Sequence, residues 1–175
     1  MLMRMHRLTL LFVALSGCRS GGQAGPSEVV GNFYAARIAS GATGAPTPET
    51  LARLRPYLSD TLAALLAAAR ARHDADFARA PDEKPSFTEG DLFSSLFEGP
   101  SEVNALADTV VGTAHRVTAR LRYSGATPPV EWSDTVILVP EHGRLVIDDL
   151  RYGGRWEFAS TGSLRSNMVT ALAAQ

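Results

Sequence analysis

Apolar and polar residues follow two different periods along this chain, and the change falls near residue 100. Between residues 27 and 80, apolar side chains recur every three or four positions, which is the spacing of amphipathic helices. Between residues 115 and 152, apolar and polar residues alternate, as they do in strands with one buried face. The pattern therefore predicts helices first and an antiparallel sheet afterwards.

Helices are predicted in the first half of the chain. The stretch SEVVGNFYAARIA, residues 27–39, has Ser27 placed as N-cap and carries one apolar stripe, formed by Val29, Val30, Phe33, Tyr34 and Ile38. A short helix is expected over Pro48–Arg55, before Pro56, and Ser59 then caps an alanine-rich helix over residues 60–80. Residues 81–100 are expected to be irregular, with one turn of helix over Asp91–Phe97.

The second half alternates between apolar and polar positions. HRVTARLRYS, VEWSDTVILV and RLVIDDLRY (residues 115–124, 130–139 and 144–152) predict three strands joined by the turns GATPP and PEHG, and a weaker pattern predicts a strand over 103–111. A last amphipathic helix, capped by Thr161 or Ser163, is marked by Leu164, Met168, Val169 and Leu172. The predicted fold class is α+β, with helices packed on one face of a curved antiparallel sheet.

The first residues have the organisation of an export signal. Two arginines lie within residues 1–7, an apolar run covers residues 8–15, and the small residues Ser16 and Gly17 precede Cys18. The apolar run is much shorter than the roughly 20 residues that span a bilayer. Residues 1–17 are therefore predicted to be a cleaved signal peptide.

The segment Leu15-Ser16-Gly17-Cys18 resembles the lipobox of bacterial lipoproteins. The resemblance implies that the Cys18 thiol receives diacylglycerol, that cleavage precedes it, and that a further acyl chain is added. Two or more acyl chains give a stable membrane anchor, which one chain does not. Arg19, where inner-membrane lipoproteins tend to have Asp, implies the periplasmic side of the outer membrane. A plain secretory signal with an incidental cysteine is the alternative.

Composition narrows the function classes. The chain has 17 basic and 18 acidic residues, so its charge does not favour nucleic acid. It contains no HExxH, phosphate-loop, GxSxG, dinucleotide or CxxC motif, and we predict no cofactor. The predicted organisation is a signal peptide over 1–17, the lipidated Cys18 with a Gly/Ser/Pro tether over 18–26, and a single domain over 27–175.

Several stretches resemble an uncharacterised bacterial lipoprotein family of the nuclear transport factor 2-like (cystatin-like) superfamily. These stretches are FYAARI, LRPYLSDTLAALL, GDLFSSLFEGP and GRLVIDDLRYGG. The resemblance implies a cone-shaped α+β domain from residue 27 to the C-terminus. It implies no mechanism, because this fold carries enzymes, binding modules and scaffolds.

Carboxylates near the predicted cone are the catalytic candidates. Asp148 and Asp149 point to opposite faces of one strand, so they cannot form a dyad with each other. Asp149 or Asp134 would serve as general base if it faced the cone, near Tyr34, His115 or Trp132. The alternative for Asp149 is a place at a strand end or bulge, or an ion pair with Arg151 or Arg155.

Aromatic and metal-capable residues are further candidates. Tyr34, Trp132 and Trp156 are expected to line a ligand pocket, and burial of Trp156 and Phe158 at the cone mouth is favoured over an exposed partner-binding anchor. His73 and Asp76 share a helix face, but two ligands without a further cluster predict a half-buried histidine and no metal site.

Three arginines are predicted to lie on one strand face: Arg116, Arg120 and Arg122. We expect Glu131 on the next strand to pair with one of them. A solvated, charge-balanced face is the favoured interpretation, and docking of an anionic partner is the alternative. The face does not suit nucleic acid, because no aromatic residues interleave with the arginines.

The sequence favours a membrane-anchored periplasmic lipoprotein whose domain binds a small apolar ligand or an envelope protein without catalysis. An isomerase or dehydratase using Asp149 or Asp134 as base is the first alternative, and a periplasmic immunity-type inhibitor is the second. A deep pocket in the cone with an isolated acid and a hydrogen-bonding partner would favour the enzyme, and a filled cone would exclude it.

Overall fold

The computed structural model describes residues 24–174. The predicted signal peptide and the predicted lipidation site at Cys18 lie outside these residues. Within residues 24–174, no helix is both long enough and apolar enough to cross a membrane.

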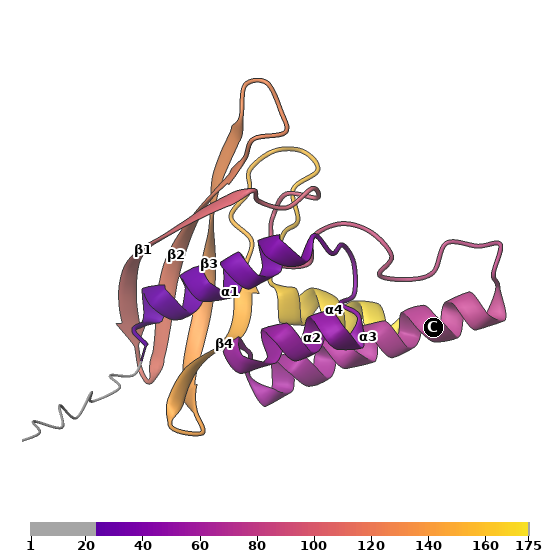
Figure 1. The fold of residues 1–175 in the computed structure, drawn as a ribbon, viewed down its shortest axis with the longest axis horizontal. Helices are drawn as coiled ribbons and strands as arrows, with labels where there is room; N and C mark the ends of the chain where they lie inside the picture. Colours follow the sequence, from indigo (N-terminus) through magenta and orange to yellow (C-terminus); the bar gives the residue numbers. More distant parts are fainter. Residues whose placement is uncertain (1–23, 175) are drawn as a thin grey trace, which may run out of the picture.

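The fold is α+β, as predicted. The helices are α1 (Pro26–Ser40), α2 (Pro48–Leu54), the 3₁₀ turn η1 (Arg55–Tyr57), α3 (Asp60–Arg79) and α4 (Leu164–Ala173). The strands are β1 (Glu102–Val111), β2 (Ala114–Tyr123), β3 (Val130–Glu141) and β4 (Arg144–Arg151), which form an antiparallel sheet in the order β1-β2-β3-β4. The helices gather on one side of this curved sheet, and α1 runs across it (Figure 1).

Helix starts follow the capping residues, with one correction. Ser59 caps α3 by accepting a hydrogen bond from the backbone N–H of Leu62, as predicted, and Ser163 caps α4 within a capping box. The prediction of Ser27 as the cap of α1 is wrong, because Gly25 is the N-cap and Pro26 is the first helical residue. Proline fits that position because its fixed φ suits a helix and its missing N–H is not needed there.

The turn of helix predicted over Asp91–Phe97 does not form; the segment consists of turns and bends. Two local side-chain bonds replace helical ones: the Asp91 carboxylate accepts from the N–H of Phe93 at 2.7 Å, and the Ser94 hydroxyl accepts from that of Leu96 at 3.0 Å. Aspartate and serine compete with the helix in this way. We call residues 85–100 the anchored loop, for the contacts described below.

The core lies between the sheet and the helices. The alternation predicted for β2 and β3 is confirmed, with these core residues fully or almost fully buried: Val117, Ala119, Leu121, Trp132, Val136 and Leu138. Phe33 of α1 packs edge-to-face on Phe93 of the anchored loop, with ring centroids 5.2 Å apart. On the opposite face, Arg122 pairs with Glu131 at 3.7 Å, which confirms the predicted cross-strand pair. The packing of Phe33 on Phe93 shows that the anchored loop belongs to the core.

Two glycines before α2 give a matched test of how tightly the anchored loop packs. Both have left-handed φ, +58° at Gly41 and +64° at Gly44. A Cβ at Gly44 would lie 2.2 Å from the carbonyl oxygen of Phe87, whereas nothing lies within 4 Å of one at Gly41. Gly44→Ala should therefore cost about 3–5 kcal/mol of unfolding free energy in urea titrations, and Gly41→Ala only about 1–2 kcal/mol. Equal losses would contradict the tight packing.

Candidate functional site

The structure brings some predicted site residues together and separates others. Trp132 on β3 packs against Trp156, which follows β4, and donates to Asp134 on the same strand, while Tyr34 of α1 reaches the same anchored loop that Asp134 contacts. His115 and Asp149 bond to other partners.

Asp134 is completely buried, and donors surround its carboxylate. One oxygen accepts from the Ser95 hydroxyl in a short hydrogen bond and from the N–H of Gly153 at 2.8 Å. The other accepts from the N–H of Ser95 at 2.9 Å and from the indole N–H of Trp132 at 3.1 Å. Asp134 thus joins the anchored loop, β3 and the segment after β4.

Sequence analysis missed Ser95, which is fully buried and completes this network. Its hydroxyl oxygen accepts from the N–H groups of Gly153 and Gly154, each at 3.0 Å. Gly153 passes so close to β3 that an added Cβ would lie 2.1 Å from the carbonyl oxygen of Ser133. The available signal was the polar pair inside the apolar stretch GDLFSSLF, since buried hydroxyls require partners.

A buried ion pair, also missed, fixes the start of the anchored loop. The Arg37 guanidinium on α1 lies 3.1 Å from the Asp91 carboxylate, and both side chains are less than a tenth exposed. The guanidinium also lies 5.9 Å from the centroid of the Phe93 ring. Burial raises the pKa of the Asp91 carboxyl, and the neighbouring Arg37 charge works in the opposite direction. The sequence signal for this ion pair was the charge of Arg37 near the apolar stripe of the first helix.

Two tyrosines hold the middle of the loop by its backbone. The Tyr34 hydroxyl donates to the carbonyl of Phe93 at 2.9 Å, and the Tyr152 hydroxyl donates to that of Leu92 at 2.6 Å. Burial raises the pKa of both phenols above the ordinary value, so both remain protonated donors. Among residues 24–174, no buried side-chain nitrogen or oxygen lacks a hydrogen-bond partner. Tyr34 thus supports the loop.

Asp149 and His115 lie in separate places. One Asp149 oxygen accepts from the N–H of Leu150 at 2.8 Å and from that of Arg165, in the first turn of α4, at 3.0 Å. The pairing of β3 with β4 shifts register at this point, which matches the alternative interpretation of Asp149 as a bulge residue. His115 pairs with Asp108 at 2.8 Å across β1 and β2. A general-base role for Asp149 or Asp134 stays a prediction.

The two aromatic residues after β4, Trp156 and Phe158, differ in burial. Trp156 is partly buried, and its ring lies nearly perpendicular to that of Trp132 with centroids 6.1 Å apart. The predicted burial of Phe158 is wrong, because its side chain is 84% exposed. The backbone turns here, with the N–H of Ala159 bonded to the carbonyl of Trp156, and this turn places Phe158 at an exposed corner.

His73 and Asp76 do not form a joint site. His73 is partly buried, as predicted, and contacts Asp74 at 3.1 Å. The Asp76 carboxylate instead contacts Arg72 and Arg79, each at 3.0 Å, and accepts from the N–H of Ser86. Asp76 therefore secures the C-terminal end of α3.

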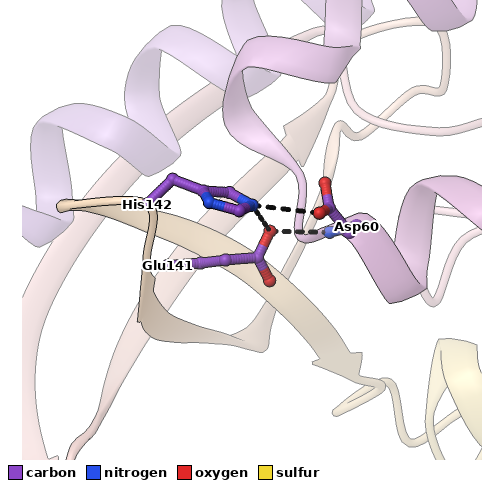
Figure 2. A group of neighbouring side chains, drawn as sticks. All are labelled: Asp60, Glu141 and His142. Atoms are coloured by element: carbon purple, nitrogen blue, oxygen red, sulfur yellow. Dashed lines mark hydrogen bonds and ion pairs between the residues drawn. The ribbon is translucent and has the colours of Figure 1, made fainter.

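A second cluster, formed by Asp60, Glu141 and His142, lies at the surface where the β3–β4 hairpin meets the start of α3 (Figure 2). The His142 Nε2 atom lies 3.0 Å from Asp60 and 3.6 Å from Glu141, and Glu141 accepts from the N–H of Asp60 at 2.9 Å. Sequence analysis missed this cluster because about 80 residues separate its two segments. The only sequence signal for this cluster was the turn PEHG, which contains Glu141 and His142.

Two carboxylates and an imidazole are metal-ligand types, and their ligand atoms all lie within 4.8 Å of one another. Two features oppose a cation. Asp60 stands in the first turn of α3, where the helix dipole is positive, and it already pairs closely with Arg55. The cluster is therefore better suited to clamping the hairpin onto α3.

The cluster of Asp60, Glu141 and His142, which we call the clamp, predicts how its stabilisation depends on pH. The contacts with Arg55 first, and then His142, lower the pKa of the Asp60 carboxyl to about 2. Because the folded-state pKa is lowered, the stabilisation is present above the ordinary value of 3.8 and is lost as the pH falls towards 2. An NMR titration should show this midpoint, and Arg55→Ala should raise it more than His142→Ala. His73→Ala, the control, should leave it unchanged; an Asp60 midpoint near 3.8 in the parent protein would contradict the clamp.

A helix-backed antiparallel sheet that follows a lipobox-like segment is the organisation expected of a small lipoprotein. Over 155 residues, the chain is 30% identical to the uncharacterized lipoprotein YbjP of Escherichia coli K12, which covers 87% of this chain and 82% of that protein. The chain belongs to the YbjP family of lipoproteins. Membership supports association with the cell envelope.

Two further comparisons add little. No established family profile matches the chain. A crystal structure of a protein of unknown function from Bacteroides thetaiotaomicron aligns with 70% of this chain and 85% of that chain, at 17% identity and a TM-score of 0.33.

Proposed function

We propose that the mature protein is a periplasm-facing lipoprotein of the outer membrane, held by acyl chains on Cys18, whose folded domain is a non-catalytic binding module. The observation that carries this proposal is the agreement between the segment Leu15–Cys18 and the lipoprotein relative. Two or three acyl chains on one cysteine supply a stable anchor. Arg19 after the cysteine supports the outer membrane over the inner one.

For the domain, we propose a nuclear transport factor 2-like (cystatin-like) fold over residues 27–175, after a signal peptide over 1–17 and a tether over 18–26. The support is the curved four-stranded antiparallel sheet, with α1 across it and the other helices on the same side. This architecture alone does not decide between an enzyme and a binding module.

Two observations favour binding at the surface. Tyr34 and Trp132, which were expected to line a pocket, bond instead to the anchored loop and to Asp134 respectively, and Asp134 itself bonds to the loop. Exposed aromatic rings instead lie on Phe97 of this loop and on Phe158, in a segment that Ser160 joins to Ser95 by a backbone hydrogen bond. A depression of about 210 Å³ between the anchored loop and α4 adds concave surface. An envelope protein fits this surface better than an enclosed small ligand.

Cell fractionation tests the anchor. Cys18→Ser should move the protein from the membrane fraction to the soluble periplasmic fraction, because the thiol is the only group that can form the thioether. Ser16→Ala keeps a small residue in the lipobox and should stay in the membrane fraction. If Cys18→Ser stays there with Ser16→Ala, the anchor proposal is wrong.

A further inference from the structure

We infer that the end of the domain next to Ala24 rests on the phospholipid bilayer, with Val110 and Val111 at the tip of the β1–β2 hairpin entering the headgroup region. The inference rests on the proposed anchor at Cys18 and adds the orientation of the domain. We call this end, with both of its hairpin tips, the proximal end.

The fold places the chain start and two hairpins at the same end. In an antiparallel meander, the β1–β2 and β3–β4 turns lie at the same end of the sheet. The register agrees, because His115 pairs with Leu138 and Leu138 pairs with Ile147. Ala24 lines a depression together with Arg144 and Leu145, at the start of β4. Figure 1 shows the start of α1 and both turns at this end.

The length of the tether decides which end is close to the membrane. Five residues lie between Cys18 and Ala24, and the six Cα-to-Cα steps span at most about 20 Å when the chain is fully extended. The β2–β3 turn, residues 124–129, lies a full strand away from the proximal end, which is about 33 Å for ten residues. An anchor at Cys18 therefore keeps the proximal end beside the bilayer.

The proximal end has the surface chemistry that a bilayer contact requires. Two large apolar side chains are exposed beside the β1–β2 turn: Val110 is 61% exposed and Val111 is 46% exposed. The nearby depression, about 210 Å³ in volume, is mostly apolar, lined by Ala24, Val29, Pro56, Tyr57 and Leu145, with Asn32 and Arg144 as its polar members. Apolar side chains with a nearby cation suit the boundary between acyl chains and phosphate groups.

The opposite end differs. Its β2–β3 turn reads SGATPP and adds no large apolar side chain to the surface. Phe158 is more exposed than either valine, but it is not at the proximal end. It follows the C-terminal end of β4, whereas Arg144 at the other end of this strand belongs to the proximal end. The aromatic rings are therefore on the side away from the bilayer, where a protein partner can reach them.

Site-specific fluorescence tests this orientation in the full lipidated protein. Cys18 is the only cysteine and is blocked by acylation, so Val110→Cys introduces a single free thiol for an environment-sensitive dye. Ala126→Cys, in the β2–β3 turn, is the matched control. In phosphatidylcholine–phosphatidylglycerol vesicles with brominated upper acyl chains, quenching at position 110 should exceed that at position 126 by at least about twofold.

Flotation of the same vesicles separates this inference from the anchor. If the protein floats with the vesicles and quenching at 110 is no greater than at 126, the bilayer contact is wrong and the anchor stands. If the protein does not float, both are wrong. Val111→Asp, combined with the dye at 110, should reduce quenching and leave flotation unchanged, because the acyl chains still hold the protein; undiminished quenching would contradict insertion of the tip.

Discussion

Asp134→Ala is expected to lower the free energy of unfolding by about 3–5 kcal/mol, because it removes a buried charged acceptor and leaves its donors without partners. The donors that lose their acceptor are the backbone N–H of Ser95 and the indole of Trp132, whereas the N–H of Gly153 keeps its bond to the Ser95 hydroxyl oxygen. Ser95 is completely buried and Trp132 is 7% exposed, so water cannot replace Asp134 as their acceptor while the anchored loop stays on β3. Urea unfolding followed by tryptophan fluorescence measures the loss.

The neighbouring residue Ser133 provides the control. Its side chain is exposed and points to the other face of β3, so Ser133→Ala should change the free energy of unfolding by less than about 0.5 kcal/mol. A similar small effect of Asp134→Ala would mean that the network does not hold the loop. Asp134 would then be free for another role, and the general-base hypothesis would become the better interpretation.

Arg37→Met should also cost about 3–5 kcal/mol at pH 7, because it leaves the Asp91 carboxylate buried without its counter-charge. Methionine keeps most of the apolar volume, so the loss reports the charge more than the packing. The double variant Arg37→Met/Asp91→Asn should recover a large part of the loss, since an amide still accepts from the N–H of Phe93. Arg53→Met, at an exposed position on α2, should be nearly neutral.

The loss in Arg37→Met should depend on pH in a defined direction. Burial already raises the pKa of the Asp91 carboxyl in the parent protein, and removing Arg37 removes an influence that lowers it. A carboxyl whose pKa is raised in the folded state destabilises that state at higher pH, and this cost falls as the group binds a proton. The deficit should therefore narrow as the pH falls from 7. A deficit that widens would show that Asp91 is not the group left unpaired.

Local pattern was enough to predict the framework. Alternation in β2 and β3 placed Val117 and Val136 in the core, and Ser59 marked the start of α3, because these signals depend on period and on capping chemistry within a few residues. The error at Ser27 has the same local origin. A serine and a proline compete for the start of α1, and the proline at its first position decided it.

The arrangement around the anchored loop is not predictable in this way. Asp134 lies on the buried face of β3, but its partner Ser95 lies 39 residues away. Arg37 and Asp91 are 54 positions apart, and the clamp at His142 joins segments more than 80 residues apart. No periodicity encodes such pairs. A buried polar residue on an apolar face indicates only that some partner exists.

The mass of the mature protein extracted from membranes tests the central claim most directly. We expect a chain that begins at Cys18, lacks residues 1–17, and carries the mass of diacylglycerol with a further acyl chain on that residue. Its tryptic N-terminal peptide should contain all of the added mass. A full-length unmodified chain, or a cleaved chain with a free Cys18 thiol, would contradict the account.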